Sequence, residues 1–118
     1  MNFIANDREP VYQQIIRYMR QLIVKGHLKP GDPVPSRREM AINIKVNPNT
    51  VQKAYKEMED MGIINTVRTY QSTITTDEKI LSKIKYDLIH ESLEVFIENM
   101  RAIDVEKDEI IEIIKDSY

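Results

Sequence analysis

The spacing of hydrophobic residues predicts that most of this chain is helical. Over residues 10–25, apolar side chains recur at steps of three and four, which is typical of an amphipathic helix with one buried stripe. Residues 28–35 contain three prolines and one glycine, so they are expected to form a stiff connector with room for a short strand. The helical spacing returns over residues 77–103 and predicts one long helix. Residues 105–118 supply four further isoleucines and predict a short final helix.

Two closely spaced helices between these segments carry start signals. Ser36 and Glu39 stand three residues apart and can form a capping box, in which each side chain satisfies a free N–H at the helix start. Asn47 is a favoured N-cap residue, and Pro48 suits the first helical position. The turn between the two helices is short, which is typical of a helix-turn-helix motif. These helices are predicted to span about residues 36–44 and 47–61.

Residues 63–75 have no helical period and are rich in β-branched side chains, so they predict two short antiparallel strands. A strand pair directly after a helix-turn-helix forms a winged helix. The predicted fold class is therefore mainly α: a winged helix-turn-helix of three helices and a two-stranded wing, followed by a C-terminal two-helix dimerisation tail. We expect the DNA-binding domain at residues 1–76 and the tail at residues 77–118.

The distribution of charge sharpens this division. Residues 1–76 carry 11 basic and 7 acidic side chains, a net charge of +4, whereas residues 77–118 carry 6 and 12, a net charge of −6. A basic part joined to an acidic part indicates that the first meets a polyanion and the second is kept away from it, with chance as the alternative. The chain has no cysteine and no apolar run long enough to cross a bilayer. It is expected to be cytoplasmic, with no membrane partner.

The outer face of the third helix carries candidate base-reading residues. A recognition helix places its N-terminal residues against base edges in the major groove. Short amides and hydroxyls suit that place, because Asn and Gln can pair with adenine and Thr can contact a thymine methyl. The predicted contacts are Asn47, Pro48, Asn49, Thr50, Gln52, Lys53 and Lys56. The residues expected to face the core are Val51, Ala54, Met58 and Met61. The alternative is that the polar residues only cap an ordinary surface helix.

Arg37 and Arg38 open the second helix, where cations oppose the positive end of the helix dipole. A phosphate nearby would resolve this conflict, so both are candidate DNA contacts. The alternative is a solvated pair of surface charges.

Three motifs follow one another: "LKPGD", "PSRREMA" and "VNPNTVQKAYKEME". In this order they resemble the DNA-binding domain of the GntR family of bacterial transcription regulators, and they are closest to its YtrA-type subfamily. The resemblance covers about residues 10–75 and implies that Arg38 and the start of the recognition helix contact DNA. It also implies a short C-terminal tail in place of a large effector-binding domain. A further implication is that the regulated genes include a membrane transporter.

The chain departs from the family pattern at two places. The wing tip reads Arg68, Thr69, Tyr70 and Gln71 where relatives usually carry glycines. Without glycine the tip cannot so easily adopt positive φ or let the backbone approach the minor groove. Arg68 is nevertheless predicted to reach a phosphate or the groove. Lys45 stands in the turn of the helix-turn-helix, where glycine is also common.

The apolar stripe of the long helix is too extensive for a lone helix to bury. It is expected to pack against the same surface of a second chain, together with the C-terminal isoleucines. A homodimer would also hold two recognition helices roughly 34 Å apart, as a palindromic operator requires. The alternative is that the tail folds onto its own DNA-binding domain. The predicted dimerisation residues are Leu81, Ile84, Leu88, Leu93, Phe96, Ile97, Met100, Ile110, Ile113 and Ile114.

The sequence gives no sign of catalysis. His90 and Glu94 lie one helical turn apart, but a third metal ligand is not evident. No nucleophile–base pattern or phosphate-binding loop occurs. We therefore predict neither an enzyme nor a cofactor, but a homodimeric repressor that binds a double-stranded DNA operator. Two alternatives stay open: an unknown small-molecule effector bound between the domains or in the dimer cleft, and a winged-helix adaptor whose tail docks another protein.

Overall fold

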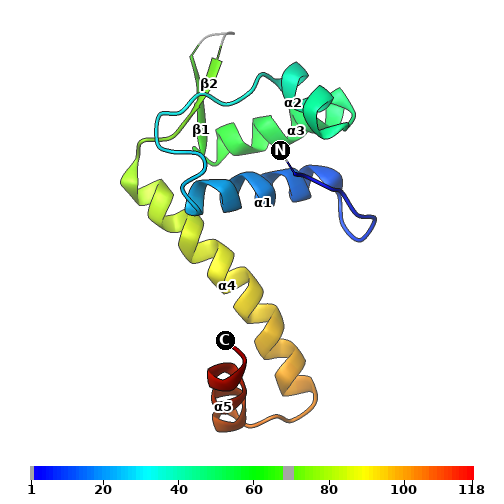
Figure 1. The fold of residues 1–118 in the computed structure, drawn as a ribbon, viewed down its shortest axis with the longest axis vertical. Coiled ribbons are helices and arrows are strands. Elements are labelled where there is room, and N and C mark those ends of the chain that lie inside the picture. The colour runs from blue at the N-terminus through cyan, green and yellow to red at the C-terminus, as the bar shows by residue number, and fades with distance from the viewer. Residues whose placement is uncertain (1, 68–70) are drawn as a thin grey trace. The chain divides into compact units, whose positions relative to one another are not determined.

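The computed structural model of the chain describes residues 2–67 and 71–118, which form five helices and two strands (Figure 1). The helices are α1 (Val11–Val24), α2 (Arg37–Ile44), α3 (Pro48–Asp60), α4 (Glu78–Ala102) and α5 (Lys107–Ser117). The strands are β1 (Ile64–Val67) and β2 (Gln71–Ile74). Each helix lies close to its predicted bounds, and the mainly α winged helix-turn-helix with a two-helix C-terminal segment is confirmed.

The chain divides into two compact units, Met1–Leu88 and Ile89–Tyr118, which are named here the winged-helix unit and the tail unit. The winged-helix unit extends beyond the boundary expected after residue 76. The reason is that the first turns of α4 pack on the core of this unit, where Ile84 is buried.

The caps predicted for the helix-turn-helix are present. The Glu39 N–H donates to Ser36 Oγ (3.1 Å), and the Ser36 N–H donates to the Glu39 carboxylate (3.4 Å), which completes the capping box. Asn47 Oδ1 accepts a hydrogen bond from the Asn49 N–H (2.8 Å) at the start of α3. Between the helices, Lys45 caps α2 in the left-handed region, with φ 56°. Lys45 therefore adopts, at a steric cost, a backbone conformation that glycine adopts freely.

The core of the winged-helix unit lies between α1 and α3, which Figure 1 shows side by side, and α2 packs on α3. Val51, Ala54 and Met58 are buried as predicted. The prediction for Met61 is wrong, because α3 ends at Asp60 and the Met61 side chain remains 49% exposed. Tyr55 is buried on the same helix instead.

The wing is a two-stranded antiparallel sheet in which Ile64 pairs with Ile74 and Val67 with Gln71. The connector joins its edge, because Pro33 bridges Thr73 and the Val34 N–H donates to the Ser72 carbonyl (2.8 Å). The strand expected in the connector is thus reduced to one bridge. The wing-tip residue Arg68, predicted to contact DNA, lies outside the described residues.

The turn into the wing also fixes the start of α4. Gly62 has φ +77°, and a Cβ at this position would lie 2.8 Å from Ile80 Cδ1 of α4. The backbone conformation therefore favours glycine here, and a larger residue would also require the Ile80 side chain to shift.

Three of the predicted dimerisation residues lie in the winged-helix unit. Ile84 is only 4% exposed and belongs to the core of that unit, while Leu81 and Leu88 are partly buried and pack against that core. The chain's own core therefore covers Ile84, whereas the role of Leu81 and Leu88 in dimerisation stays a prediction. The sequence could not distinguish the two uses, because the same stripe continues along the whole of α4.

Candidate nucleic-acid interface

The N-terminal half of α3 exposes a polar face with positive charge. Val51, Ala54 and Tyr55 bury the opposite face. Between residues 48 and 56 the only charged side chains are two lysines, whereas the acidic residues of α3 lie between residues 57 and 60. The predicted contact residues are exposed on this face, except for the half-buried Thr50: Asn47, Pro48, Asn49, Gln52, Lys53 and Lys56.

The amides on this face differ in what they can offer a ligand. The Asn47 side-chain oxygen is already occupied by the Asn49 N–H, so Asn47 mainly fixes the start of the helix. Within the described part of the chain, the side-chain amides of Asn49 and Gln52 make no hydrogen bond to protein. Each can therefore present a donor and an acceptor together, which is the pattern that pairs with adenine.

The two lysines of α3 are held in different ways. Lys56 Nζ lies 3.9 Å from the Asp60 carboxylate, and both side chains are largely exposed, so this ion pair contributes little stability. Lys53 Nζ lies 4.0 Å from the ring centroid of Tyr12, on the first turn of α1. The contact between Tyr12 and Lys53 had no signal in the sequence.

The adjacent arginines of α2 have separate surroundings. Arg37 forms an ion pair with Glu59 of α3, and its guanidinium lies 5.2 Å from the ring centroid of Tyr55. Its charge is thus used within the protein to tie α2 to α3. Arg38 is exposed to solvent. Of the two arginines of α2 that were predicted to contact DNA, Arg38 is the one that is more exposed to solvent.

Tyr55 anchors the same region from the inside. Its hydroxyl donates to the Pro35 carbonyl (2.6 Å), which links α3 to the connector before α2. Burial raises the pKa of the Tyr55 hydroxyl well above its ordinary value, so this donor keeps its proton at neutral pH. Tyr55 and Arg37 together fix the position of α3 relative to α2.

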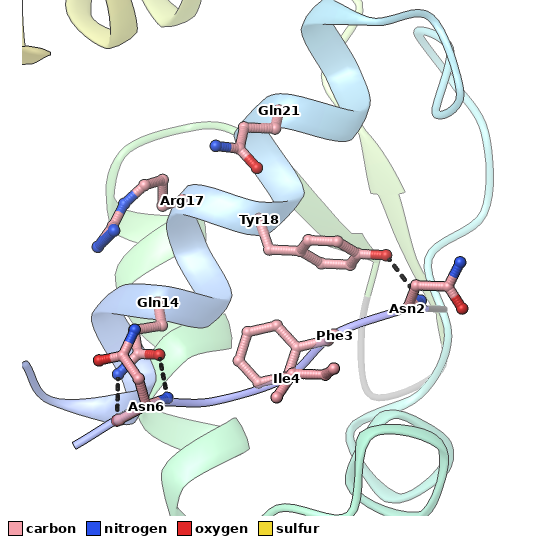
Figure 2. Close-up of a pocket in the computed structure, with 8 residues that line it drawn as sticks. All are labelled: Asn2, Phe3, Ile4, Asn6, Gln14, Arg17, Tyr18 and Gln21. Carbon is pink, nitrogen blue, oxygen red and sulfur yellow. Dashed lines mark hydrogen bonds between the residues drawn. The ribbon is translucent and has the colours of Figure 1, made fainter. Parts of the chain in front are cut away.

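The residues before α1 form a segment that lies along that helix (Figure 2). Phe3 packs edge-on against Tyr18, with the ring centroids 5.5 Å apart. The buried Gln14 accepts from the Asn6 N–H (2.9 Å) and donates to the Asn6 and Glu9 carbonyls (2.9 and 2.8 Å). A cavity of about 280 Å³ remains between segment and helix. These contacts of Gln14 could not be predicted from the sequence, because their partners are backbone groups.

The family is decided by the comparisons with known proteins. A family model described as "Bacterial regulatory proteins, gntR family" matches residues 11–70. The HTH-type transcriptional repressor YtrA of Bacillus subtilis is 44% identical over 108 residues, which cover 91% of this chain and 83% of that protein. The chain belongs to the GntR family.

Solved structures agree with a YtrA-type member of the GntR family. A GntR family transcriptional regulator from Listeria monocytogenes matches with a TM-score of 0.90 and 35% identity, over 97% of this chain and 100% of that one. BusR of S. agalactiae, solved in complex with its busA-promotor DNA, matches with a TM-score of 0.55 and 26% identity, over 89% of this chain and 55% of that one. This chain is a helix-turn-helix transcriptional regulator, and the comparisons indicate no enzymatic family.

The tail unit of this GntR-family regulator presents a second kind of surface. An apolar groove with a volume of about 530 Å³ runs between α5 and the part of α4 within this unit. Phe96 remains 37% exposed and Ile113 55% exposed. The predicted dimerisation residues that line the groove are Leu93, Phe96, Ile97, Met100, Ile110 and Ile114.

Among residues 2–67 and 71–118, no three side chains that could bind a metal ion lie together. No helix in that part of the chain is both long and apolar enough to span a membrane.

Proposed function

We propose that this regulator binds a palindromic operator in duplex DNA as a homodimer and represses transcription. The observation that carries the proposal is the exposed N-terminal half of α3, where amides without protein partners lie beside two lysines. Two similar proteins support it, since YtrA of Bacillus subtilis is a transcriptional repressor and BusR was solved in complex with promoter DNA. A protein with this role would act in the cytoplasm.

The face of α3 suggests a division of labour. Asn49 and Gln52 would read base edges in the major groove, and Thr50 would contact a thymine methyl. Arg38 and the lysines would contact phosphates, which position the helix without reading sequence. Arg37 is not part of this proposed contact set, because its guanidinium is engaged by Glu59 and Tyr55.

The dimer would form through the tail unit. Apolar side chains that a single chain leaves exposed are expected to become covered by a second copy, which removes them from water. The proposed interface consists of Leu93, Phe96, Ile97, Met100, Ile110, Ile113 and Ile114, and it omits the three predicted residues that lie in the winged-helix unit.

Selection from a random duplex pool, followed by a salt titration, tests the proposal. We expect enriched sites to be palindromic, with half-sites roughly 10 base pairs apart from centre to centre. Affinity should fall steeply with rising salt, because each phosphate contact releases counterions. Absence of duplex binding at low salt would favour a protein-binding adaptor instead, and enrichment of a single asymmetric half-site would contradict the dimer.

A small-molecule effector is a second candidate, favoured by the apolar groove of the tail unit. Thermal stabilisation of the protein by a panel of apolar metabolites, together with release of the selected operator, would support it. Stabilisation of the wild-type protein that weakens as its concentration, and with it the fraction of dimer, rises would instead mean that the groove is the dimer interface.

A further inference from the structure

The contact between Lys53 and Tyr12 joins two elements that are separate in sequence. Lys53 is exposed on α3, and its ammonium lies 4.0 Å from the ring centroid of Tyr12. Tyr12 is half-buried and packs against the core of the winged-helix unit. Its hydroxyl accepts a hydrogen bond from Gln13 Nε2 (3.2 Å). The Lys53 ammonium is thus held against an aromatic ring that itself packs on the core.

The turn that carries Tyr12 is itself held in place. Gln14, two residues further on, binds the backbone of Asn6 and Glu9 through three hydrogen bonds. Arg17 adds an ion pair to Glu9. These contacts fix the start of α1 from outside the core, so the Tyr12 ring offers Lys53 a rigid support.

The two lysines of α3 show why an aromatic support matters. Lys56 is paired with Asp60, whose negative charge weakens the attraction between Lys56 and a DNA phosphate. Tyr12 is neutral and attracts the Lys53 ammonium through the negative face of its ring. The ring therefore restricts the long side chain, which otherwise loses much rotamer freedom on binding, and leaves its full charge available.

We propose that Tyr12 is a positioning residue for DNA binding, and that it holds the Lys53 ammonium ready for a phosphate of the duplex. The proposal rests on the proposed function and extends it, because it makes the first turn of α1 part of the interface. It differs from a purely structural role for Tyr12, since the effect of the ring must pass through Lys53.

A double-mutant cycle on the full-length protein tests this. Fluorescence anisotropy with a labelled duplex of the selected operator would compare wild type, Tyr12→Leu, Lys53→Ala and the double variant. We expect Tyr12→Leu to weaken binding by about two- to fivefold in the wild-type background and to have no further effect in Lys53→Ala. Lys53→Ala should lower the salt slope by about one.

Two conservative replacements separate the attraction from packing. Tyr12→Phe keeps the aromatic face and should bind within about twofold of wild type. Tyr12→pentafluorophenylalanine keeps a six-membered ring of similar shape but removes its negative face, so it should bind like Tyr12→Leu. This second variant retains the packing of the core and keeps the test decisive if the leucine variant is unstable.

Three results would overturn the inference. The first is an equal loss for Tyr12→Leu in both backgrounds, which would mean that Tyr12 acts independently of Lys53. The second is tighter binding on removal of the ring, which would mean that Tyr12 withholds the lysine from DNA. The third is wild-type affinity in the fluorinated variant. Failure of the wild-type protein to bind any duplex would instead refute the proposed function.

Discussion

The winged-helix unit and the tail unit differ in how far each covers its own apolar residues. All sixteen buried hydrophobic residues among the described positions lie between Ile15 and Ile84. Across residues 89–118, which the structure describes throughout, none is buried. The first unit closes a core and exposes polar groups on α3, whereas the second exposes the apolar side chains that a core would need. The first unit therefore buries its apolar surface by itself, whereas the exposed apolar surface of the second unit is what the proposed dimer would cover.

The largest expected effect follows from placing a charge in the groove of the tail unit, which should weaken dimerisation. Ile97→Asp would replace an apolar side chain of the proposed interface with a carboxylate, at a cost of about 2–5 kcal/mol, or about thirtyfold or more in the dimerisation constant. Sedimentation should therefore detect monomers. Asn99→Asp adds the same charge at an exposed position of α4 and should leave the dimer intact. An intact dimer in Ile97→Asp would place the interface elsewhere.

Truncation inside the closed core should affect stability instead. Ile84→Ala removes a buried side chain and is expected to lower the free energy of unfolding by about 2–5 kcal/mol. Ile89→Ala, on the same helix but 53% exposed, should change it by less than about 0.5 kcal/mol in a monomeric background. Urea unfolding of both variants measures the difference. Equal effects would show that the two units are not distinct in burial.

Base reading should depend on the exposed polar face of the closed unit. Asn49→Ala is expected to cost about 1–3 kcal/mol on the selected operator and to relax the base preference at one position of each half-site. Stability should hardly change, because the exposed Asn49 side chain makes no hydrogen bond to the described part of the protein. Binding measurements on single-base operator variants provide the readout, and unchanged selectivity would remove Asn49 from the reading set.

The smallest expected effect concerns the turn between α2 and α3. Lys45 holds φ 56°, so Lys45→Gly should stabilise the winged-helix unit by about 1 kcal/mol. Thermal unfolding would detect this as a rise in Tm. Lys45→Ala removes the same charge but keeps the Cβ atom, and it should bring no such gain. Equal shifts in the two variants would mean that charge, and not backbone conformation, controls stability at this turn.

Local signals made much of the fold predictable. Ser36, Glu39, Asn47 and Pro48 specify two helix starts through contacts within three residues, and the structure contains both caps. The loss of helical period after Gly62 was enough to predict the wing. Motif order added the family, which the comparisons confirm.

Long-range contacts could not be predicted in this way. Arg37 and Glu59 are 22 residues apart, and nothing near either one indicates that they pair. The stripe of α4 is continuous in sequence, so its pattern could not reveal that Ile84 packs inside its own unit. Nothing in the residues around Tyr12 indicates its contact with Lys53, because the two lie on different helices. For the proposed DNA contacts on α3, the spacing of apolar residues was enough to predict which side chains are exposed. Their roles in DNA binding stay predictions.

The approach of Ile80 to Gly62 has a consequence for how this protein can change over time. A larger residue at position 62 would displace only the end of the Ile80 side chain, whereas the backbone angle disfavours every residue with a Cβ atom. Descendants are therefore expected to keep glycine at position 62 while the side chain at position 80 varies in size.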